Sequence, residues 1–379
     1  MLFIENSTQK AIHFNGSYNF MSNSLSNGFA STLFYGGFLD EETKINERER
    51  LSKINSVGAY AHTELIASNL WGKDSARIKI GVVTGNYNYI GWQYSDDFFN
   101  LVFFGNKNYV GKVADMSGSH YSVNQFSKLG ASFFLPKDKL TINIALVAGH
   151  AHAEGRYSNL SLYTHPDAAQ LDLGTKGYSV FADTSKNHIR GIGGAIDLYF
   201  RAHEDNRNGY LNLYVINAGF ISWQNSRQLN FDTTYSYSGF EFNNLLNNSN
   251  FSANPASIQD SLLPETVFKN NISALPFFLG VEGRFAPFKQ DYILIKYGVN
   301  TSPIPGYKIQ TSLGFVYLKD KWTFSTIGNY GGFGKFSGDI TASYRNEKIS
   351  VGISAFQPQG FFLNSSSGKG VSLRFSKNL

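Results

Sequence analysis

Three residues of one alternating stretch have the types and spacing of metal ligands. His150, His152 and Glu154 are two positions apart, so on a β-strand their side chains would share one face. Imidazole nitrogens and carboxylate oxygens are common zinc ligands, and His165 and Asp167 follow a short distance along the chain. The competing interpretation, a polar loop or strand end, is the commoner setting for such residues. We therefore assign no metal ligand from the sequence.

Two glycine-rich stretches begin like nucleotide-binding motifs, but neither completes one. The stretch Gly191 to Gly194 has Ile196 where the third glycine of a dinucleotide fingerprint belongs. The stretch Gly332 to Lys335 has Ser337 at the equivalent position, and Lys335 is followed by Phe336 rather than by Ser or Thr. Small residues that face a crowded sheet explain both stretches. We predict no cofactor-binding residues.

No catalytic constellation is visible in the chain. Cysteine is absent and histidine occurs 8 times, which excludes disulfide scaffolds, cysteine-ligated metals and thiol catalysis. The nucleophile-elbow pattern G-x-S-x-G does not occur. Asp96 and Asp97 are adjacent carboxylates, but acidic residues at the start of a helix explain them more simply. We predict no catalytic residues and no enzyme.

The composition is rich in aromatic residues and poor in charge. The 379 residues include 33 Phe, 22 Tyr and 4 Trp, and charged residues make up 16% of the chain, against roughly 25% in an ordinary soluble domain. The net charge of +5 is spread along the chain, so no nucleic-acid partner is expected. No run of 18 apolar residues occurs, so no transmembrane helix is expected.

Apolar and polar residues alternate from one end of the chain to the other, as in β-strands. The polar face holds Gly, Ser, Thr, Asn and Ala, whereas a soluble sandwich would expose Lys and Glu. Charged residues cluster at strand ends, as in the turn Lys319 to Lys321. Strands with one apolar and one small polar face can cross lipid only if they close into a barrel. Near the end, Ile349, Val351 and Ile353 should face lipid, and Ser350, Gly352 and Ser354 should face the lumen.

The sequence therefore predicts an all-β protein: a single closed antiparallel transmembrane β-barrel of about 14 strands with short helical inserts, as one domain over residues 1–379. A strand is also expected over residues 28–37. The first ten residues show no basic segment followed by an apolar core, so no signal peptide is expected there. Because an outer-membrane protein must be exported, this interpretation expects the export signal to lie outside the printed sequence. The expected location is the cell outer membrane, and the expected partner is its lipid bilayer.

Three segments do not alternate. Asp40 to Lys53 is highly charged and predicts a short exposed helix. Residues 95–109 are apolar at helical spacing, with a serine as N-cap. Residues 240–275 are rich in Asn and Ser, with a helix expected near 258–263. The aromatic run Phe98 to Phe104 must be buried somewhere, so we expect 95–109, and with it part of 240–275, inside the lumen. Contact with the membrane surface is the alternative for 95–109.

Four stretches resemble a family of Bacteroidota outer-membrane barrels of unknown function: Tyr18 to Leu25, Tyr35 to Asp40, Lys53 to Gly58 and Asp97 to Lys107. The resemblance covers most of the chain but transfers no functional residue. More loosely, the predicted architecture looks like the fatty-acid-transporter (FadL) type of 14-stranded barrel. It also looks like the PorV and PorP/SprF-like barrels associated with type IX secretion.

Two functions are consistent with these observations. One is a channel or transporter, similar to the FadL type, that passes small apolar or amphipathic solutes through a constricted lumen. The other is a structural or accessory barrel that partners outer-membrane secretion or assembly machinery without transport of its own. The second is favoured by an apparent lack of lumen charge, which an ion or sugar porin would use to select its solutes.

Overall fold

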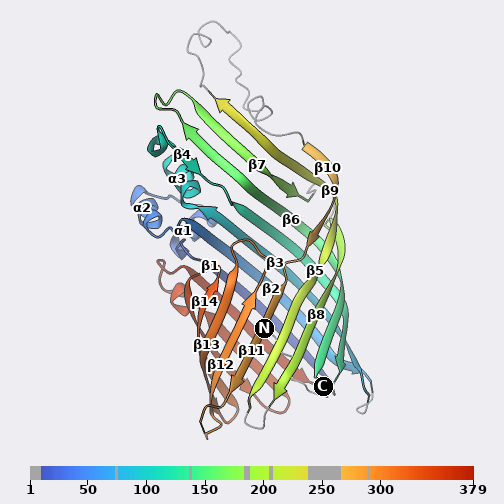
Figure 1. Ribbon diagram of the computed structural model, residues 1–379. Helices are drawn as coiled ribbons and strands as arrows, with labels where there is room; N and C mark the ends of the chain where they lie inside the picture. The colour runs from blue at the N-terminus through green and yellow to red at the C-terminus, as the bar shows by residue number, and fades with distance from the viewer. Residues whose placement is uncertain are drawn as a thin grey trace.

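The alternating segments pair with their neighbours as antiparallel strands, and the first strand pairs with the last to close a barrel of 14 strands. The closing pair runs from Ala11 opposite Asn378 to Met21 opposite Gly368. The computed structural model (Figure 1) describes residues 10–72, 76–135, 139–182, 188–204, 208–237, 266–288 and 290–379. The barrel strands are β1 (Ala11–Ser22), β2 (Ile54–Trp71), β3 (Lys79–Ser95), β5 (His120–Leu135), β6 (Leu140–Thr164), β8 (Gly191–Glu204), β9 (Tyr210–Tyr237), β11 (Phe278–Phe285), β12 (Ile293–Thr301), β13 (Lys308–Lys319), β14 (Trp322–Gly332), β15 (Phe336–Arg345), β16 (Ile349–Phe356) and β17 (Gly368–Asn378).

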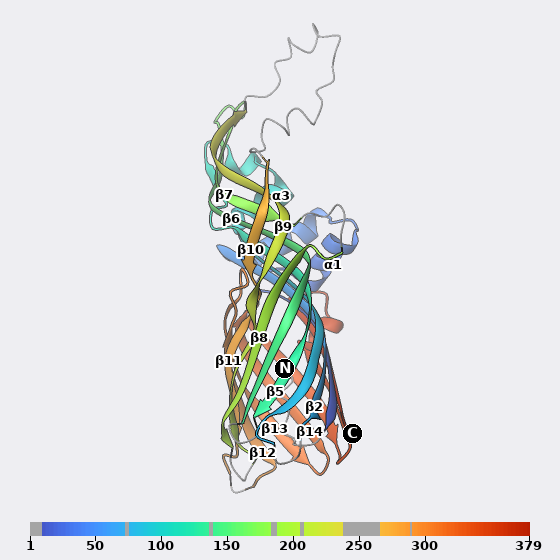
Figure 2. The same cartoon turned by 90° about the vertical axis from the view of Figure 1, so that its right-hand side faces the viewer.

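One wall of the barrel is much taller than the other. Strands β11 to β17 have 8 to 12 residues, close to the roughly 9–11 that a tilted strand needs to cross a membrane. Strands β6 and β9 have 25 and 28 residues and continue above the rim (Figures 1 and 2). Three further strands pair with these continuations: β4 (Val113–Asp115), β7 (Leu171–Phe181) and β10 (Thr266–Ala274). We call this upper sheet the extension. The barrel below it is flattened, broad in Figure 1 and narrow in Figure 2.

The predicted alternation of faces is confirmed on strand β16. Val351 and Ile353 are 39% and 55% exposed on the outer surface. Ser354 is 3% exposed and its hydroxyl accepts a hydrogen bond from that of Thr341 on β15 at 2.9 Å. The same alternation places Leu294 inside, in a small apolar cluster with Ala286 and Val316. The outer wall is thus apolar on these strands, and the inner wall is built mostly from small and polar side chains.

Arginine at the two faces of β16 should have different costs. In lipid vesicles, Val351→Arg is expected to lower the free energy of unfolding by about 2–4 kcal/mol because it places a charge in the apolar band. Ser350→Arg should cost much less, because Ser350 points to the inner side. Urea unfolding of the two reconstituted variants measures the difference. Equal losses would show that the faces are wrongly assigned.

Two of the three expected helical features agree with the structure, and one strand prediction is wrong. α2 (Glu41–Glu49) lies within the charged segment predicted to be helical, with Asp40 as its N-cap, and α3 (Asp96–Phe104) begins directly after its predicted N-cap Ser95. Residues 28–37, predicted as a strand, instead form most of α1 (Asn27–Tyr35) because the Ser26 hydroxyl accepts the Phe29 amide and starts a helix. Two 3₁₀ turns complete the set, η1 (Lys107–Tyr109) and η2 (Pro358–Phe361). Among the described residues, no helix is both long and apolar enough to span a membrane.

The structure places α3 outside the barrel, so the expectation that residues 95–109 lie in the lumen is wrong. Tyr89 of β3 lines the interior. Trp92 and Tyr94 lie three and five positions further along the same strand, so their side chains point outward. The Phe98 ring lies 5.1 Å from that of Trp92, and the Phe99 ring lies 5.6 Å from that of Phe29 in α1. The aromatic run Phe98 to Phe104 is buried between the outer wall and α1. These side chains are thus removed from water, as predicted, but on the outside of the barrel. Of the other insert, 240–265 lies outside the described residues, and most of the remainder is strand β10.

Candidate functional site

The loop between β12 and β13, residues 302–307, closes the upper lumen by reaching the opposite wall. Strand β3 lies across the barrel from this loop in the strand order. A Cβ atom placed on Gly91 of β3 would lie 2.3 Å from Ile304 and 2.7 Å from the Pro305 carbonyl oxygen. Only glycine at position 91 lets the loop approach this closely. Ile304 is 6% exposed, so the contact is a packed seal.

Phe333, in the turn between β14 and β15, seals the lumen beside this loop. A Cβ atom on Gly58 of β2 would lie 2.2 Å from the Phe333 ring, and the Ser56 hydroxyl donates a hydrogen bond of 2.9 Å to the Phe333 carbonyl oxygen. Gly58 and Gly91 are direct partners across β2 and β3, so together they form one depression that receives the side chains of Ile304 and Phe333. Ile304 and Phe333 belong to a larger buried apolar cluster, which we call the roof cluster. Its members are Met21, Tyr87, Tyr89, Phe126, Val147, Ala182, Ala195, Ile221, Trp223, Leu275, Ile304 and Phe333.

Filling the glycine depression should displace the seal. Gly58→Leu is expected to cost about 1–3 kcal/mol of stability, because the side chain overlaps the Phe333 ring. Gly338→Leu is the matched control, since a Cβ there meets nothing within 4 Å. Thermal unfolding monitored by circular dichroism in detergent compares the two variants. Similar unfolding temperatures for Gly58→Leu and the unsubstituted protein would contradict the packing described above.

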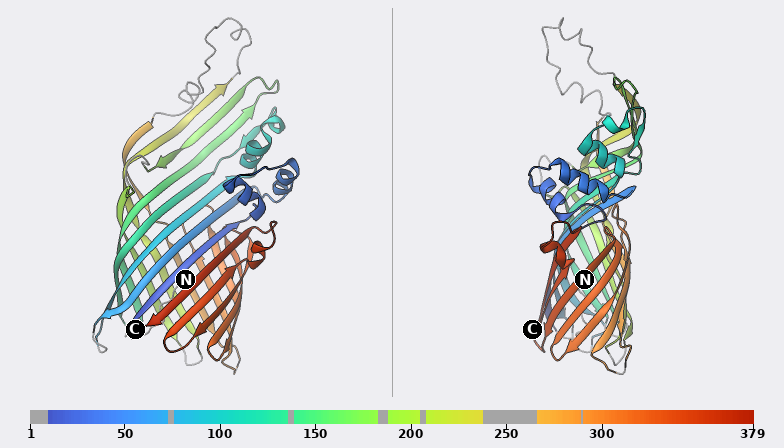
Figure 3. Two further views of the ribbon diagram at one scale, coloured as in Figure 1. Left: turned by 180° about the vertical axis from the view of Figure 1, so that it is seen from behind. Right: turned by 90° about the vertical axis from the view of Figure 1, so that its left-hand side faces the viewer.

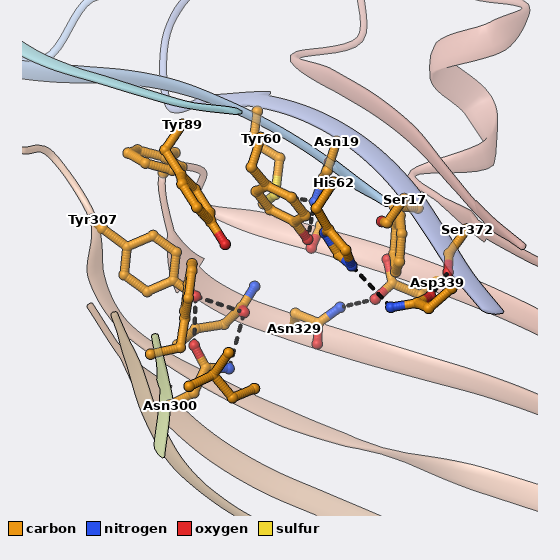
Figure 4. A pocket seen from close by; sticks show the side chains of 18 of the residues that line it. Ser17, Asn19, Tyr60, His62, Tyr89, Asn300, Tyr307, Asn329, Asp339 and Ser372 are labelled. Atoms are coloured by element: carbon orange, nitrogen blue, oxygen red, sulfur yellow. Dashed lines mark hydrogen bonds between the residues drawn. The ribbon is translucent and has the colours of Figure 1, made fainter. Parts of the chain in front are cut away.

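A cavity of about 180 Å³ lies in the lumen next to the roof cluster (Figure 4). One part of its lining is aromatic, with Tyr60, Tyr89, Phe278, Tyr307 and Phe333. The rest consists largely of amides, hydroxyls, acids and one imidazole: Asn15, Ser17, Asn19, His62, Glu64, Asn300, Gln310, Asn329, Ser337, Asp339, Gln357 and Ser372. We call this cavity the chamber. For scale, an apolar cavity of about 150 Å³ can hold benzene, so the chamber has room for a solute of one ring.

Most polar groups of the chamber hold one another in place. The Asn15 amide donates to His62 Nε2 at 2.8 Å, and the Asn19 amide donates to the Tyr60 hydroxyl at 3.0 Å. Asn329 donates to Asp339 at 2.7 Å (Figure 4). The side-chain carbonyl oxygen of Asn19 is buried and has no hydrogen-bond partner among the described residues. The chamber therefore offers a preorganised polar wall facing aromatic rings, which suits a small amphipathic solute.

A buried ion cluster crosses the lumen beside the chamber. The Lys128 ammonium is fully buried and lies 2.6 Å from the Asp197 carboxylate and 3.3 Å from that of Glu64. It also donates to Asn217 at 3.0 Å and lies 4.8 Å from the centre of the Tyr87 ring. Tyr87 in turn donates to Glu64. These groups come from β2, β3, β5, β8 and β9, so one ammonium ties five strands together.

The lower lumen is basic, which corrects the expectation that the lumen lacks charge. The side chains of Arg201 and Arg284 both lie against the Tyr210 ring, at 5.2 and 4.8 Å from its centre. Glu282 lies 3.7 Å from Lys296. The buried Nε of Arg374 has no hydrogen-bond partner in the part of the chain that the structure describes. Sequence patterning missed these charges because each is a single residue within a mostly small and polar inner face. The argument that low lumen charge favours an accessory role is therefore wrong.

The residues first considered as metal ligands are separated by a β-bulge. Strand β6 shifts register between the partners of Gln125 and Phe126, so His150 and His152 leave the sheet on opposite faces. His150 bonds Ser127 at 2.7 Å, whereas His152 bonds Asn124 at 3.0 Å and stacks on Trp223 at 5.0 Å. Within the described residues, no cluster of three or more potential ligands occurs. The glycines at 191 and 193 lie within the paired run of β8 rather than at a strand-to-helix turn.

The extension has polar ties between its strands above the barrel. The Asp172 carboxylate of β7 accepts hydrogen bonds from Gln170 at 2.9 Å and, at 2.8 Å, from His165. Hydrogen bonds from Gln170, Ser236 and His165 hold the pKa of the Asp172 carboxyl at about 2. His165 directly follows β6 and Ser236 belongs to β9, so these contacts link β7 to both strands that pair with it. The extension is thus a built sheet that continues the barrel wall.

Comparison with protein families gives one match along most of the chain. The model of a family of unknown function, DUF5723, matches residues 5–361. The chain belongs to this family. No curated protein matches the chain.

Solved structures with a similar fold are outer-membrane barrels, at low identity. The toluene transporter TodX of P. putida has 9% identity and a TM-score of 0.39, with 98% of this chain and 90% of that chain covered. The translocator domain of the autotransporter NalP from Neisseria meningitidis has 7% identity and a TM-score of 0.33, with 99% and 90% covered. A mutant of the porin of Rh. blastica has 8% identity and a TM-score of 0.26, with 97% and 100% covered.

Proposed function

We propose that the protein is an outer-membrane channel or transporter that takes small amphipathic solutes into its lumen. The membrane location is supported by the apolar outer wall and by strands of membrane-spanning length on β11 to β17. Ala11 and Asn378, which pair at one end of β1 and β17, and the short turn between β13 and β14 lie at the end opposite α1 to α3 (Figures 1 and 3). Short turns face the periplasm in bacterial barrels, so the extension is proposed to face the outside.

The chamber is the observation that carries the proposed transport function. A barrel with a purely structural role needs no preorganised cavity, and buried polar groups cost stability unless each is given a hydrogen-bond partner. The aromatic rings would take the apolar part of a solute, and Asn300 and Gln310 would bind its polar substituents. The size restricts the solute to about one ring with one or two polar groups. Passage requires the seal formed by Ile304 and Phe333 to move.

Binding of a single-ring solute tests this proposal. The protein in lipid nanodiscs should bind 4-hydroxybenzamide in calorimetric titrations, corrected for empty nanodiscs. Ser337→Phe, at a buried residue lining the chamber, should abolish binding because its ring occupies the space. Val351→Phe, on the outer wall, is the matched control and should bind normally. The absence of saturable binding by the unsubstituted protein, for this and related single-ring solutes, would refute the chamber's proposed role.

The extension favours a second candidate, an accessory barrel that partners outer-membrane secretion or assembly machinery. Edge strand β10 carries Val267, Phe268 and Ile272 with 41 to 69% exposure, and apolar edge strands can pair with another chain. Chemical crosslinking in outer membranes, followed by mass spectrometry, would detect a partner at the extension. A crosslinked partner together with a chamber that binds no solute would favour this candidate over transport.

We further propose that the chain comes from the Bacteroidota outer-membrane barrels, on the resemblance of the four stretches named above. Its likeness to FadL-type, PorV and PorP barrels is proposed from the architecture. The solute class proposed here follows from the chamber's size and lining alone.

A further inference from the structure

Two uncharged segments at the upper rim expose a set of large apolar side chains. Residues 27–39 contain α1 and its tail, residues 356–367 contain η2, and neither segment has a charged residue. Clusters of exposed apolar residues mark contact surfaces, whereas scattered ones need no explanation. The exposed side chains, between 43% and 90% accessible, are Leu33, Phe34, Tyr35, Phe38, Phe361, Phe362 and Leu363. We call them the rim surface.

Hydrogen bonds join the two segments, so the rim surface is a single structural feature. The Gly28 amide donates to the Asn364 carbonyl oxygen at 2.9 Å, and the Asn27 side chain donates to the Gly360 carbonyl oxygen at 3.1 Å. Arg50, after α2, donates to the carbonyl oxygens of Ser24 and Ser365, both at 2.9 Å. One guanidinium thereby ties the start of α1 to the η2 segment. The aromatic side chains project from a rigid support.

The rim surface continues the apolar outer wall of the barrel. Phe29 of α1 packs on Phe20, an outward residue of β1. One outward position lower, Tyr18 is paired with Val371 of β17, and both are 40% exposed. Leu373 extends this wall downward with 47% exposure. Figure 3 shows the helices and the η2 segment at the upper ends of β1 and β17.

The character of the surface changes sharply at α2. Its nine residues, Glu41–Glu49, include six charged ones, directly after an uncharged segment. An apolar surface next to a charged helix is the arrangement of elements that lie at the boundary between lipid and water. In water, each exposed Phe would forgo roughly 1.5–3 kcal/mol of burial. Lipid that already covers the wall below is the nearest apolar medium.

We propose that the rim surface inserts into the outer leaflet, the one on the side of the long loops, and so fixes the depth and tilt of the barrel. The occupant is lipid, and the side chains reach about 5–10 Å into the boundary between headgroups and acyl chains. This inference rests on the proposed membrane location. It is independent of whether the chamber binds a solute.

The absence of cysteine allows single labels without background. Phe34→Cys and Phe362→Cys, each carrying a nitroxide label, report the rim surface. Ile353→Cys reports the mid-height wall, and Glu42→Cys on α2 reports water. The labelled proteins are reconstituted in vesicles of phosphatidylcholine and phosphatidylglycerol. Power-saturation spectroscopy then compares collisions with oxygen, which enriches in lipid, and with a water-soluble nickel chelate.

The labels at positions 34 and 362 are expected to favour oxygen over the chelate, at a depth between those of positions 42 and 353. If they collide with the chelate as freely as the label at position 42, while the label at position 353 stays protected, the rim surface faces water and the inference is overturned. That result leaves the membrane location intact. If the label at position 353 is also open to the chelate, the membrane location itself fails, and the inference fails with it.

Discussion

Lys128→Met is expected to lower the free energy of unfolding by about 3–5 kcal/mol, because it leaves two buried carboxylates without their cation. The Lys128 side chain is 0% exposed, and those of Asp197 and Glu64 are 2% and 7% exposed. Methionine replaces the length of the side chain, so the loss is mainly electrostatic. Urea titration in lipid vesicles, followed by tryptophan fluorescence, measures it.

Neutralising the carboxylates as well provides the control for this prediction. Glu64→Gln with Asp197→Asn, added to Lys128→Met, keeps the volumes and removes the unpaired charges. The triple variant should recover a large part of the lost stability, since a buried ion pair as a whole often contributes little. A single variant as stable as the unsubstituted protein would show that the cluster is not buried as described.

Removing the seal is expected to raise single-channel conductance severalfold. Ile304→Ser combined with Phe333→Ser takes away the two side chains that fill the depression at Gly58 and Gly91. The lumen would then be open beside the chamber, because the roof cluster depends on these two residues to reach the opposite wall. Planar-bilayer recording compares the double variant with the unsubstituted protein, which should be closed for most of the time.

Phe362→Ser is the matched control for this experiment. It also removes a large aromatic side chain, but from the exposed outer rim, and should leave conductance unchanged. If the double variant folds and inserts normally yet conducts no better than Phe362→Ser, Ile304 and Phe333 do not close the lumen.

The sequence predicted the barrel because its signal is repeated on every strand. The alternation in segments such as Leu140 to Leu146 gives both the strands and their faces, and the structure confirms a closed barrel of about 14 strands. The N-cap Ser95 predicted the start of α3, and the charged segment Asp40 to Lys53 predicted α2. Local chemistry was enough at these positions, because the determining contacts lie within three residues.

Contacts between distant residues could not be predicted in the same way. The aromatic run of α3 required burial, but both the lumen and the outer wall satisfy that requirement. Ile304 contacts Gly91, and Phe333 contacts Gly58, although the two residues of each pair are more than 200 positions apart in the sequence. The bulge in β6 that separates His150 from His152 has no signature in the sequence. The chamber is likewise assembled from single residues of many strands.

Uptake of 4-hydroxybenzamide by proteoliposomes tests the proposed transport function most directly. Vesicles containing the unsubstituted protein should take up the solute faster than protein-free vesicles and with saturation, and Ser337→Phe should return the rate to that of protein-free vesicles. Uptake that is no faster than in protein-free vesicles, by a correctly folded and inserted protein, would contradict the account.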